Sequence, residues 1–450
     1  MTTHEALILL LIAAGALAAP VLGERIGWFT APVEALYGAL VSTFIPDAHA
    51  PGPFISGLAE LSFLLLMFLV GLEIDFTLLR QRGPRALAKA LAVVVGIQAA
   101  ALLLTIALGQ PLIVALMGGA LSVSLLLVVL QQQSLVHTNF GQQALLVASL
   151  GEFLAIIELT AYDLAARYGL DWPLALAALK LLALLLAGVL TLRALVWLAQ
   201  EHPGRVARLF RVSDTAEVGV RAALALMLAF AAIAAFLRVE QILATFIAGM
   251  VSGYAFRRQR IVTHKLMTLG QGFFLPIFFI TVGMSLRLTE MLNLATLGQI
   301  LSLLGIITVT RLLATPLLRS LDLRWTQAAA GALLLSAPLT LLVAIAQVGI
   351  NLGQLSAASQ GVTIGAAVAG AIIFPLLARP LARRTETSRP DLAATNITPL
   401  IDARLASISR PSATTWPLPG VAVDITRAPT VPRPGRMVPQ GERLRSPRGA

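Results

Sequence analysis

"LVASLGEFLAIIELTAYDLA", residues 146–165, is an apolar stretch that contains the acids Glu152, Glu158 and Asp163 but no Lys or Arg. It has the composition and length of the interior of a membrane helix. An ionised carboxylate near the centre of a bilayer costs at least about 2.5–3.5 kcal/mol, so it must face a cavity, pair with a cation or stay protonated. The stretch therefore predicts a membrane helix that carries a buried functional group.

The composition of the whole chain agrees with a protein that resides in a bilayer. Of its 450 residues, 58% are hydrophobic and 12% are charged, and the mean hydropathy is +0.86. Soluble domains carry about 25% charged residues, so a water-soluble globular protein is excluded. The lack of cysteine excludes disulfides and thiolate metal sites. The net charge of +11 comes from basic residues at helix ends and in the tail, so no nucleic-acid partner is expected.

Apolar runs long enough to cross a bilayer recur along the chain, at about 20 residues for each helix. They are separated by turn-forming and charged residues. The sequence thus predicts an all-α polytopic membrane protein with about thirteen transmembrane helices. Their expected boundaries are 5–23, 30–46, 54–76, 86–108, 112–132, 141–166, 173–199, 215–236, 240–256, 263–285, 293–318, 325–348 and 356–379.

Basic residues indicate the orientation of the spans, because short cytoplasmic loops are enriched in Lys and Arg. With the N-terminus outside, the cytoplasmic side receives the clusters at 80–89, 205–211, 257–265 and 319–324 and the C-terminal tail. The opposite loops hold only isolated arginines. We therefore expect a multi-pass protein of the cell membrane, with its N-terminus outside. The first span is expected to be retained, because no basic residue precedes it as in a signal peptide.

The composition changes abruptly after Pro380. Residues 381–450 are rich in Pro, Arg, Ser and Thr and lack apolar periodicity. We expect a transmembrane domain over residues 1–380 and a disordered basic cytoplasmic tail over residues 381–450. No Gly-rich fingerprint that follows a strand occurs there, so no nucleotide-binding domain is expected. The tail arginines could touch anionic lipid, although solvation alone accounts for them.

Of the three acids, Glu152 is expected to lie deepest. At 1.5 Å per residue it is roughly 16 Å from the cytoplasmic end of its span, close to the bilayer midplane. Glu158 lies about 9 Å further along and about 120° around the helix, as a second site residue or a structural partner of a basic residue. Asp163 is expected near the outer interface, solvated or capped. Gly151 allows a backbone or an ion to approach Glu152 closely.

Two spans contain residues that interrupt helices, "LMGGALSVSLLLVV" in the fifth and "GALLLSAPLTLLVA" in the twelfth. Pro338 removes a backbone hydrogen bond, and nearby hydroxyls can satisfy the freed groups. Broken helices at corresponding positions in two halves of a chain mark a midplane ion site. We therefore expect Ser122, Ser124 and Ser336 to be oxygen ligands of a cation, with small-residue helix packing as the alternative.

A buried cation is expected at Arg311 in the eleventh span. It could snorkel towards the cytoplasmic end, or it could pair with Glu152 or Glu158 on a neighbouring helix. Such a pair would offset the desolvation costs of both charges.

Four motifs in order carry a resemblance to a known family. They are "LSFLLLMFLVGLEIDFTLLR" at 61–80, "TNFGQQALLVASLGEFLAII" at 138–157, "ILATFIAGMVSG" at 242–253 and "FFLPIFFITVGMSLRL" at 273–288. With them, most of residues 5–380 resembles the Kef-type branch of the monovalent cation:proton antiporters, in the sodium/hydrogen exchanger superfamily. The resemblance implies an inverted-repeat antiporter fold with crossed broken helices. It also implies a mobile core domain beside a dimerisation or scaffold domain, in a homodimer.

The same resemblance assigns roles to the candidate residues. Glu152 falls where the family has the acid that binds cation or proton, and Arg311 falls where many members carry a Lys facing that acid. Ser122, Ser124 and Ser336 fall in the two unwound helices. Gly151 stands where members carry Asp, Asn or Gln, and a single acid in this family suggests electroneutral exchange.

The function expected from the sequence is secondary active transport, without enzymatic activity and without a cofactor or resident metal. A monovalent cation, Na⁺ or K⁺, would exchange for H⁺ by alternating access, with Glu152 as the shared site and Glu158 as a further proton carrier. Two alternatives stay open, a gated potassium efflux channel and a transport-inactive membrane scaffold or sensor. Sodium-coupled symport of an organic anion would need an anion site, for which only Arg311 offers a positive charge.

Overall fold

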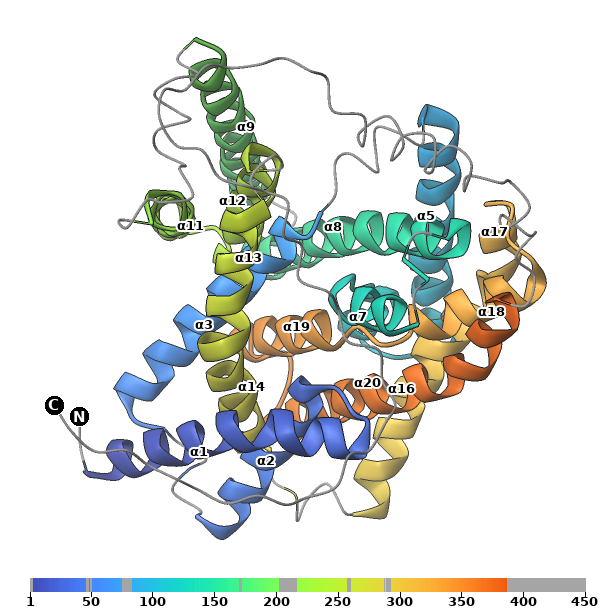
Figure 1. Cartoon of the computed structure of the whole chain (residues 1–450), viewed down its shortest axis with the longest axis horizontal. Coiled ribbons are helices and arrows are strands. Elements are labelled where there is room, and N and C mark those ends of the chain that lie inside the picture. The colour runs from blue at the N-terminus through green and yellow to red at the C-terminus, as the bar shows by residue number, and fades with distance from the viewer. Residues whose placement is uncertain are drawn as a thin grey trace, which may run out of the picture. The chain divides into compact units, whose positions relative to one another are not determined.

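Apolar helices make up the computed structural model of the chain (Figure 1). The structure describes residues 3–45, 48, 51–74, 83–133, 135–136, 138–169, 172–201, 217–256, 260–286, 288 and 293–386.

The first half contains α1 (Thr3–Ile26), α2 (Thr30–Phe44), α3 (Pro53–Leu72), α5 (Gly83–Ala107), α6 (Leu112–Gly119), α7 (Ser124–Gln132), α8 (Asn139–Tyr168) and α9 (Trp172–Glu201). The second half contains α11 (Val218–Leu237), α12 (Gln241–Ala255), α13 (Arg260–Leu269), the π-helix η2 (Gly270–Phe274), α14 (Leu275–Met284), α16 (Leu294–Leu313), α17 (Thr315–Arg319), α18 (Trp325–Leu334), α19 (Leu339–Asn351) and α20 (Ala357–Glu386).

The helices agree with the spans expected from the sequence. Among the described residues, ten helices are long and apolar enough to cross a membrane, or up to eleven when the bent pair α18 and α19 counts as one span. Each of the thirteen expected spans coincides with one helix or with consecutive helices, and the two shortest are α2 and α12, of 15 residues each. The prediction of an all-α polytopic membrane fold is therefore confirmed, while the number thirteen stays a prediction.

Large apolar side chains cover the outside of the helices. Leu17 on α1 is 78% exposed and Phe236 on α11 is 91% exposed, and exposed leucines recur on α5, α9 and α16. A water-soluble protein does not present apolar surface on this scale, whereas lipid-facing helices must. The chain is thus an integral membrane protein.

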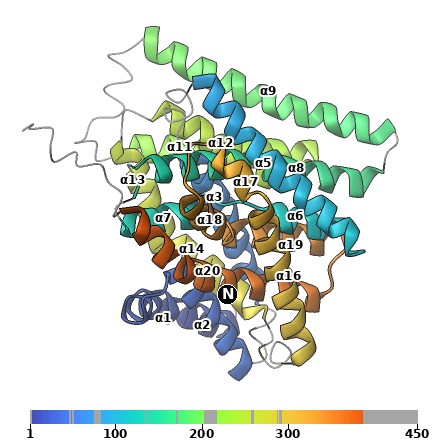
Figure 2. The same ribbon diagram turned by 90° about the vertical axis from the view of Figure 1, so that its right-hand side faces the viewer.

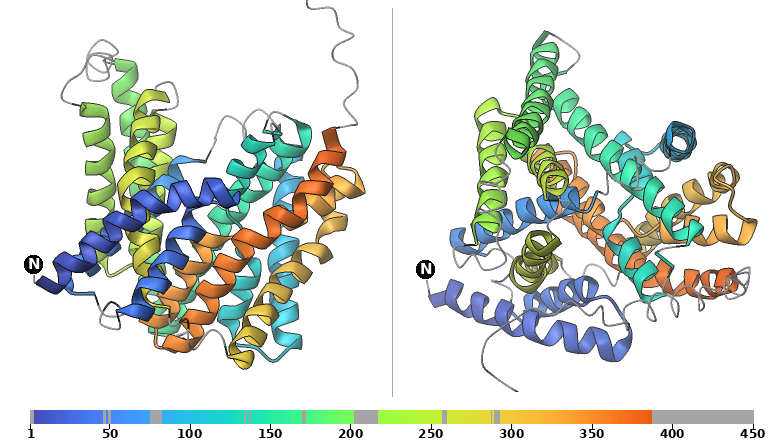
Figure 3. Two further views of the ribbon diagram at one scale, coloured as in Figure 1. Left: turned by 60° about the horizontal axis from the view of Figure 1, so that its bottom comes forward. Right: turned by 45° about the horizontal axis from the view of Figure 1, so that its top comes forward.

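The helices pack in two groups, which Figure 3 shows in different parts of the fold. The panel group consists of α1 to α3 and α11 to α14, in which α3 packs on α12 and α2 packs on α14. The core group consists of α5 to α8 and α16 to α20, in which α5 packs on α6, and α20 packs on α18 and α19. The long helix α9 lies over α8, α11 and α12 (Figure 2). These groups correspond to the scaffold and core domains of the expected fold.

Local sequence sets several helix ends. Thr138 caps α8 by accepting a hydrogen bond from the Gly141 amide at 3.1 Å, and Asn293 caps α16 by accepting one from the Ala295 amide at 3.2 Å. Pro53 opens α3, where its missing N–H costs nothing. The last described helix, α20, continues to Glu386, past the expected end of the transmembrane domain at residue 380. The rest of the expected tail, residues 387–450, lies outside the described residues.

Two glycines allow α3 and α12 to touch backbone to backbone. A Cβ at Gly249 would overlap the Phe68 carbonyl group, and a Cβ at Gly71 would overlap the Phe246 carbonyl oxygen. Small residues permit such close helix packing in membranes. The reciprocal contact locks two central helices of the panel group together.

We expect Gly249→Ala to lower the thermal unfolding midpoint of the purified protein, because overpacking costs about 1–3 kcal/mol. The matched control is Gly305→Ala in α16, where an added Cβ meets nothing within 4 Å. The control should unfold at the wild-type temperature or slightly above it. Equal midpoints for both variants would contradict the close-packing interpretation.

Candidate ion-binding site

A break at residues 120–123 separates α6 from α7 and exposes peptide groups at both helix ends. The end of α6 leaves carbonyl oxygens without helical partners, and the start of α7 leaves N–H groups without them. The helix dipoles add a partial negative charge at the end of α6 and a partial positive charge at the start of α7. Each end is met by a buried side chain of the opposite charge.

The start of α7 is met by Glu152, which lies midway along α8 and is 1% exposed. Its Oε2 accepts a hydrogen bond from the backbone N–H of Val123 at 3.0 Å. Its Oε1 accepts one from the hydroxyl of Ser122, also at 3.0 Å. The carboxylate is thus held by two donors of the break and by the positive end of a helix, an arrangement that stabilises negative charge.

The second broken helix reaches the same carboxylate through one hydroxyl. The helices α18 and α19 meet at an angle of 43° around residues 335–338, which include Pro338. Thr340, in the first turn of α19, has its Oγ1 3.2 Å from the Ser122 Oγ. Since Ser122 gives its only proton to Glu152, Thr340 must be the donor to Ser122. The two breaks therefore meet beside Glu152, and Thr340 belongs to the site.

The end of α6 is met by Arg311 of α16, whose side chain is 0% exposed. Its guanidinium donates hydrogen bonds to the carbonyl oxygens of Gly118 and Ala120, and to the Thr310 hydroxyl at 2.9 Å. Within the part of the chain that the structure describes, Arg311 makes no ion pair with an acid. The expected direct pair with Glu152 or Glu158 is absent there, because carbonyl dipoles of the break balance the charge instead.

Gly151 allows α8 to approach the break. A Cβ at this position would overlap the side chain of Leu121, whose own Cβ would lie 2.9 Å away. A larger residue would push the break away from the helix that carries Glu152. The close approach inferred from the sequence is made by the side chain of Leu121 in the break.

A second carboxylate, which the sequence reasoning missed, lies at the other side of the start of α7. Glu73 follows the last residue of α3, and its Oε2 accepts a hydrogen bond from the hydroxyl of Ser124 at 3.0 Å. Glu73 and Glu152 therefore accept hydrogen bonds from neighbouring residues at the same helix start. The signal in the sequence was an acid directly after the apolar run "FLLLMFLVGL".

The remaining predicted residues make no hydrogen bond to either carboxylate within the described part of the chain. Ser336 lies buried in the second break, but its hydroxyl donates to the carbonyl of Ala332 in the preceding helix α18 at 2.8 Å. Glu158 is half-buried on α8, and no hydrogen bond from its side chain occurs among the described residues. Ser122 and Ser124 are brought together with acids, and Ser336 and Glu158 are not.

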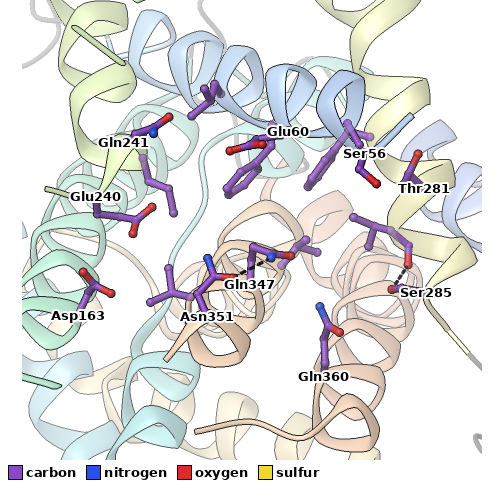
Figure 4. Close-up of a pocket in the computed structure, with 18 of the residues that line it drawn as sticks. Ser56, Glu60, Asp163, Glu240, Gln241, Thr281, Ser285, Gln347, Asn351 and Gln360 are labelled. Carbon is purple, nitrogen blue, oxygen red and sulfur yellow. Dashed lines mark hydrogen bonds between the residues drawn. The ribbon is translucent and has the colours of Figure 1, made fainter. Parts of the chain in front are cut away.

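A cavity of about 860 Å³ lies between the panel and core groups (Figure 4). It is lined at one end of the molecule by polar side chains, among them Ser56, Glu60, Asp163, Glu240, Gln347, Asn351 and Gln360. Asp163 pairs with Arg167 at 2.8 Å, and Arg167 also lies 3.6 Å from Glu240. Asp163 is therefore paired within α8 rather than solvated. The cavity does not include Glu152 among its lining residues.

No group of three or more His, Cys, Asp or Glu side chains that could hold a metal ion occurs among the described residues. The oxygen atoms that the structure places at Glu152 are those of its own carboxylate and of the Ser122 and Thr340 hydroxyls. Oxygen donors of this kind suit hard cations rather than soft metals.

Fold and site together define a class, a multi-pass membrane protein with a buried acid where two broken helices meet. A family model described as "Sodium/hydrogen exchanger, transmembrane" matches residues 8–384. The chain therefore belongs to the sodium/hydrogen exchanger family. This confirms the superfamily suggested by the motifs, and the Kef-type branch stays a prediction.

Two further comparisons agree with this assignment. The chain is 27% identical over 351 residues to "Putative Na(+)/H(+) antiporter YjbQ" of Bacillus subtilis (strain 168), a match that includes 73% of this chain. The chain spans only 55% of the length of that protein. The solved structure of the sodium proton antiporter MjNhaP1 from Methanocaldococcus jannaschii at pH 8 superposes with a TM-score of 0.60 at 15% identity. The superposition covers 83% of this chain and 96% of the antiporter chain, which shows a shared fold.

Arg311→Ala should destabilise the purified protein strongly, because a buried polar group left without its partner costs about 1–3 kcal/mol. The unfolding midpoint of Arg311→Lys should lie between those of Arg311→Ala and wild type. The lysine ammonium keeps the charge but lacks the planar guanidinium that reaches both carbonyls. Thermal unfolding and gel-filtration profiles measure the effect. An Arg311→Ala protein with the wild-type unfolding midpoint would contradict the capping role.

Proposed function

We propose that the protein exchanges a monovalent cation, Na⁺ or K⁺, for H⁺ across the membrane, with Glu152 as the site that both ions share. The observation that carries this proposal is the environment of Glu152. Its carboxylate is buried at the meeting point of two broken helices and is held by a hydroxyl and a peptide N–H. Within the described part of the chain, no basic side chain pairs with it. Its charge is therefore free to be balanced by a transported ion.

The two loaded states follow from the chemistry of a carboxylate. When deprotonated, Glu152 binds the cation together with the hydroxyl oxygens of Ser122 and Thr340. When protonated, the carboxyl group carries no charge, and the cation leaves. Both loaded states are electrically neutral, whereas the empty carboxylate is charged and is expensive to move through an apolar barrier. Exchange is obligatory because only loaded states cross.

Alternating access would come from movement of the core group against the panel group. The cavity lies between these groups at one end of the molecule, and Glu152 belongs to the core group. With the N-terminus outside and the tail in the cytoplasm, the cavity opens to the outside. A homodimer formed through the panel group is proposed on the family resemblance, and cross-linking in native membranes tests it.

We propose electroneutral one-for-one exchange, because Gly151 supplies no acid beside Glu152. Glu158 keeps only the predicted role of an additional proton carrier. A normal exchange rate in Glu158→Gln would remove it from the transport cycle.

The proposal is tested by cation-induced collapse of a pH gradient in proteoliposomes with Na⁺, K⁺ or Li⁺, with and without a clamped membrane potential. Wild type should collapse the gradient with at least one cation, at a rate that does not respond to voltage. Glu152→Gln should reduce exchange to the rate of empty liposomes, because an amide can neither bind a cation as a counter-charge nor release a proton. Exchange at the wild-type rate by this variant would refute the assignment.

The same assay separates the alternatives. A gated potassium channel would carry current without obligatory proton movement. A scaffold or sensor would show no flux under any clamp, while its tail or cytoplasmic loops would bind a partner.

Ser122→Ala should raise the half-saturating cation concentration roughly 10-fold or more, because a hydrogen bond to a charged group contributes about 1.5–3 kcal/mol. Thr340→Val should have a smaller effect, since Thr340 acts on Glu152 through Ser122. Ser336→Ala tests the predicted ligand role of that hydroxyl, which donates to a carbonyl of the preceding helix α18. If Ser336→Ala impairs cation binding more than Ser122→Ala, the geometry of the loaded site must differ from this one.

A further inference from the structure

We propose that Arg167 and Glu240 form an ion-pair latch, which holds the core group to the panel group while the cavity is open. The latch breaks when the core group moves and the cavity closes. This inference rests on the proposed alternating access, and it gives a role to two charges at the cavity that the exchange site does not use.

The first argument is that this ion pair joins the two helix groups. Arg167 lies in the last turn of α8 in the core group, and Glu240 directly precedes α12 in the panel group. The Arg167 Nη2 and the Glu240 Oε2 are 3.6 Å apart. The other ion pairs between different segments of the described chain each stay within one group, Lys89 with Asp322 in the core and Lys265 with Glu217 in the panel.

The second argument is that Asp163 fixes the base of the latch, one turn earlier on α8. The Arg167 Nε donates to both carboxylate oxygens of Asp163, at 2.8 and 2.9 Å. The Asp163 side chain is 2% exposed, whereas that of Arg167 is 41% exposed. A guanidinium has five N–H donors in a rigid plane, so a bond through Nε leaves the terminal groups available to another partner. Arg167 therefore extends from a fixed point on the core group towards Glu240.

The third argument is that α8 and α12 also touch further along their length. Phe153 of α8 stacks against Phe246 of α12, with ring centroids 6.2 Å apart. Phe153 directly follows Glu152, so this part of α8 carries the proposed ion site. A core movement that carries Glu152 therefore displaces α8 against α12, and it changes the distance between Arg167 and Glu240.

The fourth argument is the position of the latch at the cavity. Arg167, Glu240 and Asp163 all line it, and Figure 4 shows Asp163 and Glu240 at the same side of the cavity on different helices. The pair is thus made while the cavity is open. A contact that exists in one of two states favours that state by its own interaction free energy.

The test measures how fast a water-soluble thiol reagent labels a single cysteine in the cavity of the purified protein. The chain has no cysteine, so Thr281→Cys on α14 supplies one reporter that lines the cavity. We expect Arg167→Gln and Glu240→Gln each to slow labelling about two- to fivefold, the range for a partly exposed ion pair. The double variant should slow it no further, because both substitutions remove the same interaction.

Lys265→Gln is the matched control. It removes a partly exposed ion pair, with Glu217, that lies within the panel group. Labelling of Thr281→Cys in this variant should keep the wild-type rate. Gln110→Cys, exposed in the turn before α6 and outside the cavity lining, should be labelled at one rate in every variant. Equal slowing by Lys265→Gln and Arg167→Gln would show a general change of structure and would overturn the latch.

A purely electrostatic effect on the cation at the cavity would have a different signature. Arg167→Gln removes a positive charge and Glu240→Gln removes a negative one, so the half-saturating cation concentrations would change in opposite directions. The latch requires labelling to slow in both variants. Labelling at the wild-type rate, faster labelling, or additive slowing in the double variant would each contradict it.

Labelling reports the open cavity without transport, and so it separates this inference from the exchange proposal. If wild type collapses no pH gradient while Arg167→Gln and Glu240→Gln slow labelling, the proposed function fails and the latch stands. If exchange depends on Glu152 while labelling is indifferent to both substitutions, the proposed function stands and the latch fails.

Discussion

The break between α6 and α7 imposes a constraint on the rest of the core group, because its free peptide groups lie where no water or lipid can satisfy them. A membrane interior makes each such group costly. The chain meets the cost with two full charges, Arg311 at the carbonyl end and Glu152 at the N–H end. The positions of α16 and α8 around the break follow from this requirement, and so does the glycine that brings α8 against Leu121.

Arg311 and Glu152 differ in whether their charge can change. The guanidinium holds fixed backbone carbonyls and is always charged, so it belongs to the framework. The carboxylate is held by donors that tolerate either a bound cation or a proton in place of a permanent partner. A direct salt bridge between Glu152 and Arg311 would have satisfied both groups and left no vacancy for an ion. Their separation on the two sides of the break keeps the fold intact and the acid available.

Much of the fold was predictable, because hydropathy reports directly on membrane spans and an acid at the centre of a span is conspicuous. Glu152 was identified in this way, whereas Gly151 and the two breaks were identified from Gly, Ser and Pro residues within apolar spans. The partners of Arg311 were not predictable, since backbone carbonyls leave no trace in the sequence. Glu73 was missed because an acid at the end of an apolar run is typical of an ordinary membrane interface. The sequence could not show that Thr340 rather than Ser336 reaches Ser122. That choice depends on how the chain bends at Pro338, which sets the direction of each side chain.

The division between Arg311 and the hydroxyl groups also bears on how such a protein can change over evolution. The arginine fixes the break through the main chain, so its bonds persist whatever side chains occupy positions 122, 124 and 340. Substitutions among Ser, Thr and Ala at those positions would alter the size and number of ligands at the proposed ion site while the helix ends remain capped. If the protein exchanges ions as proposed, single substitutions at these positions would change ion preference without unfolding the protein.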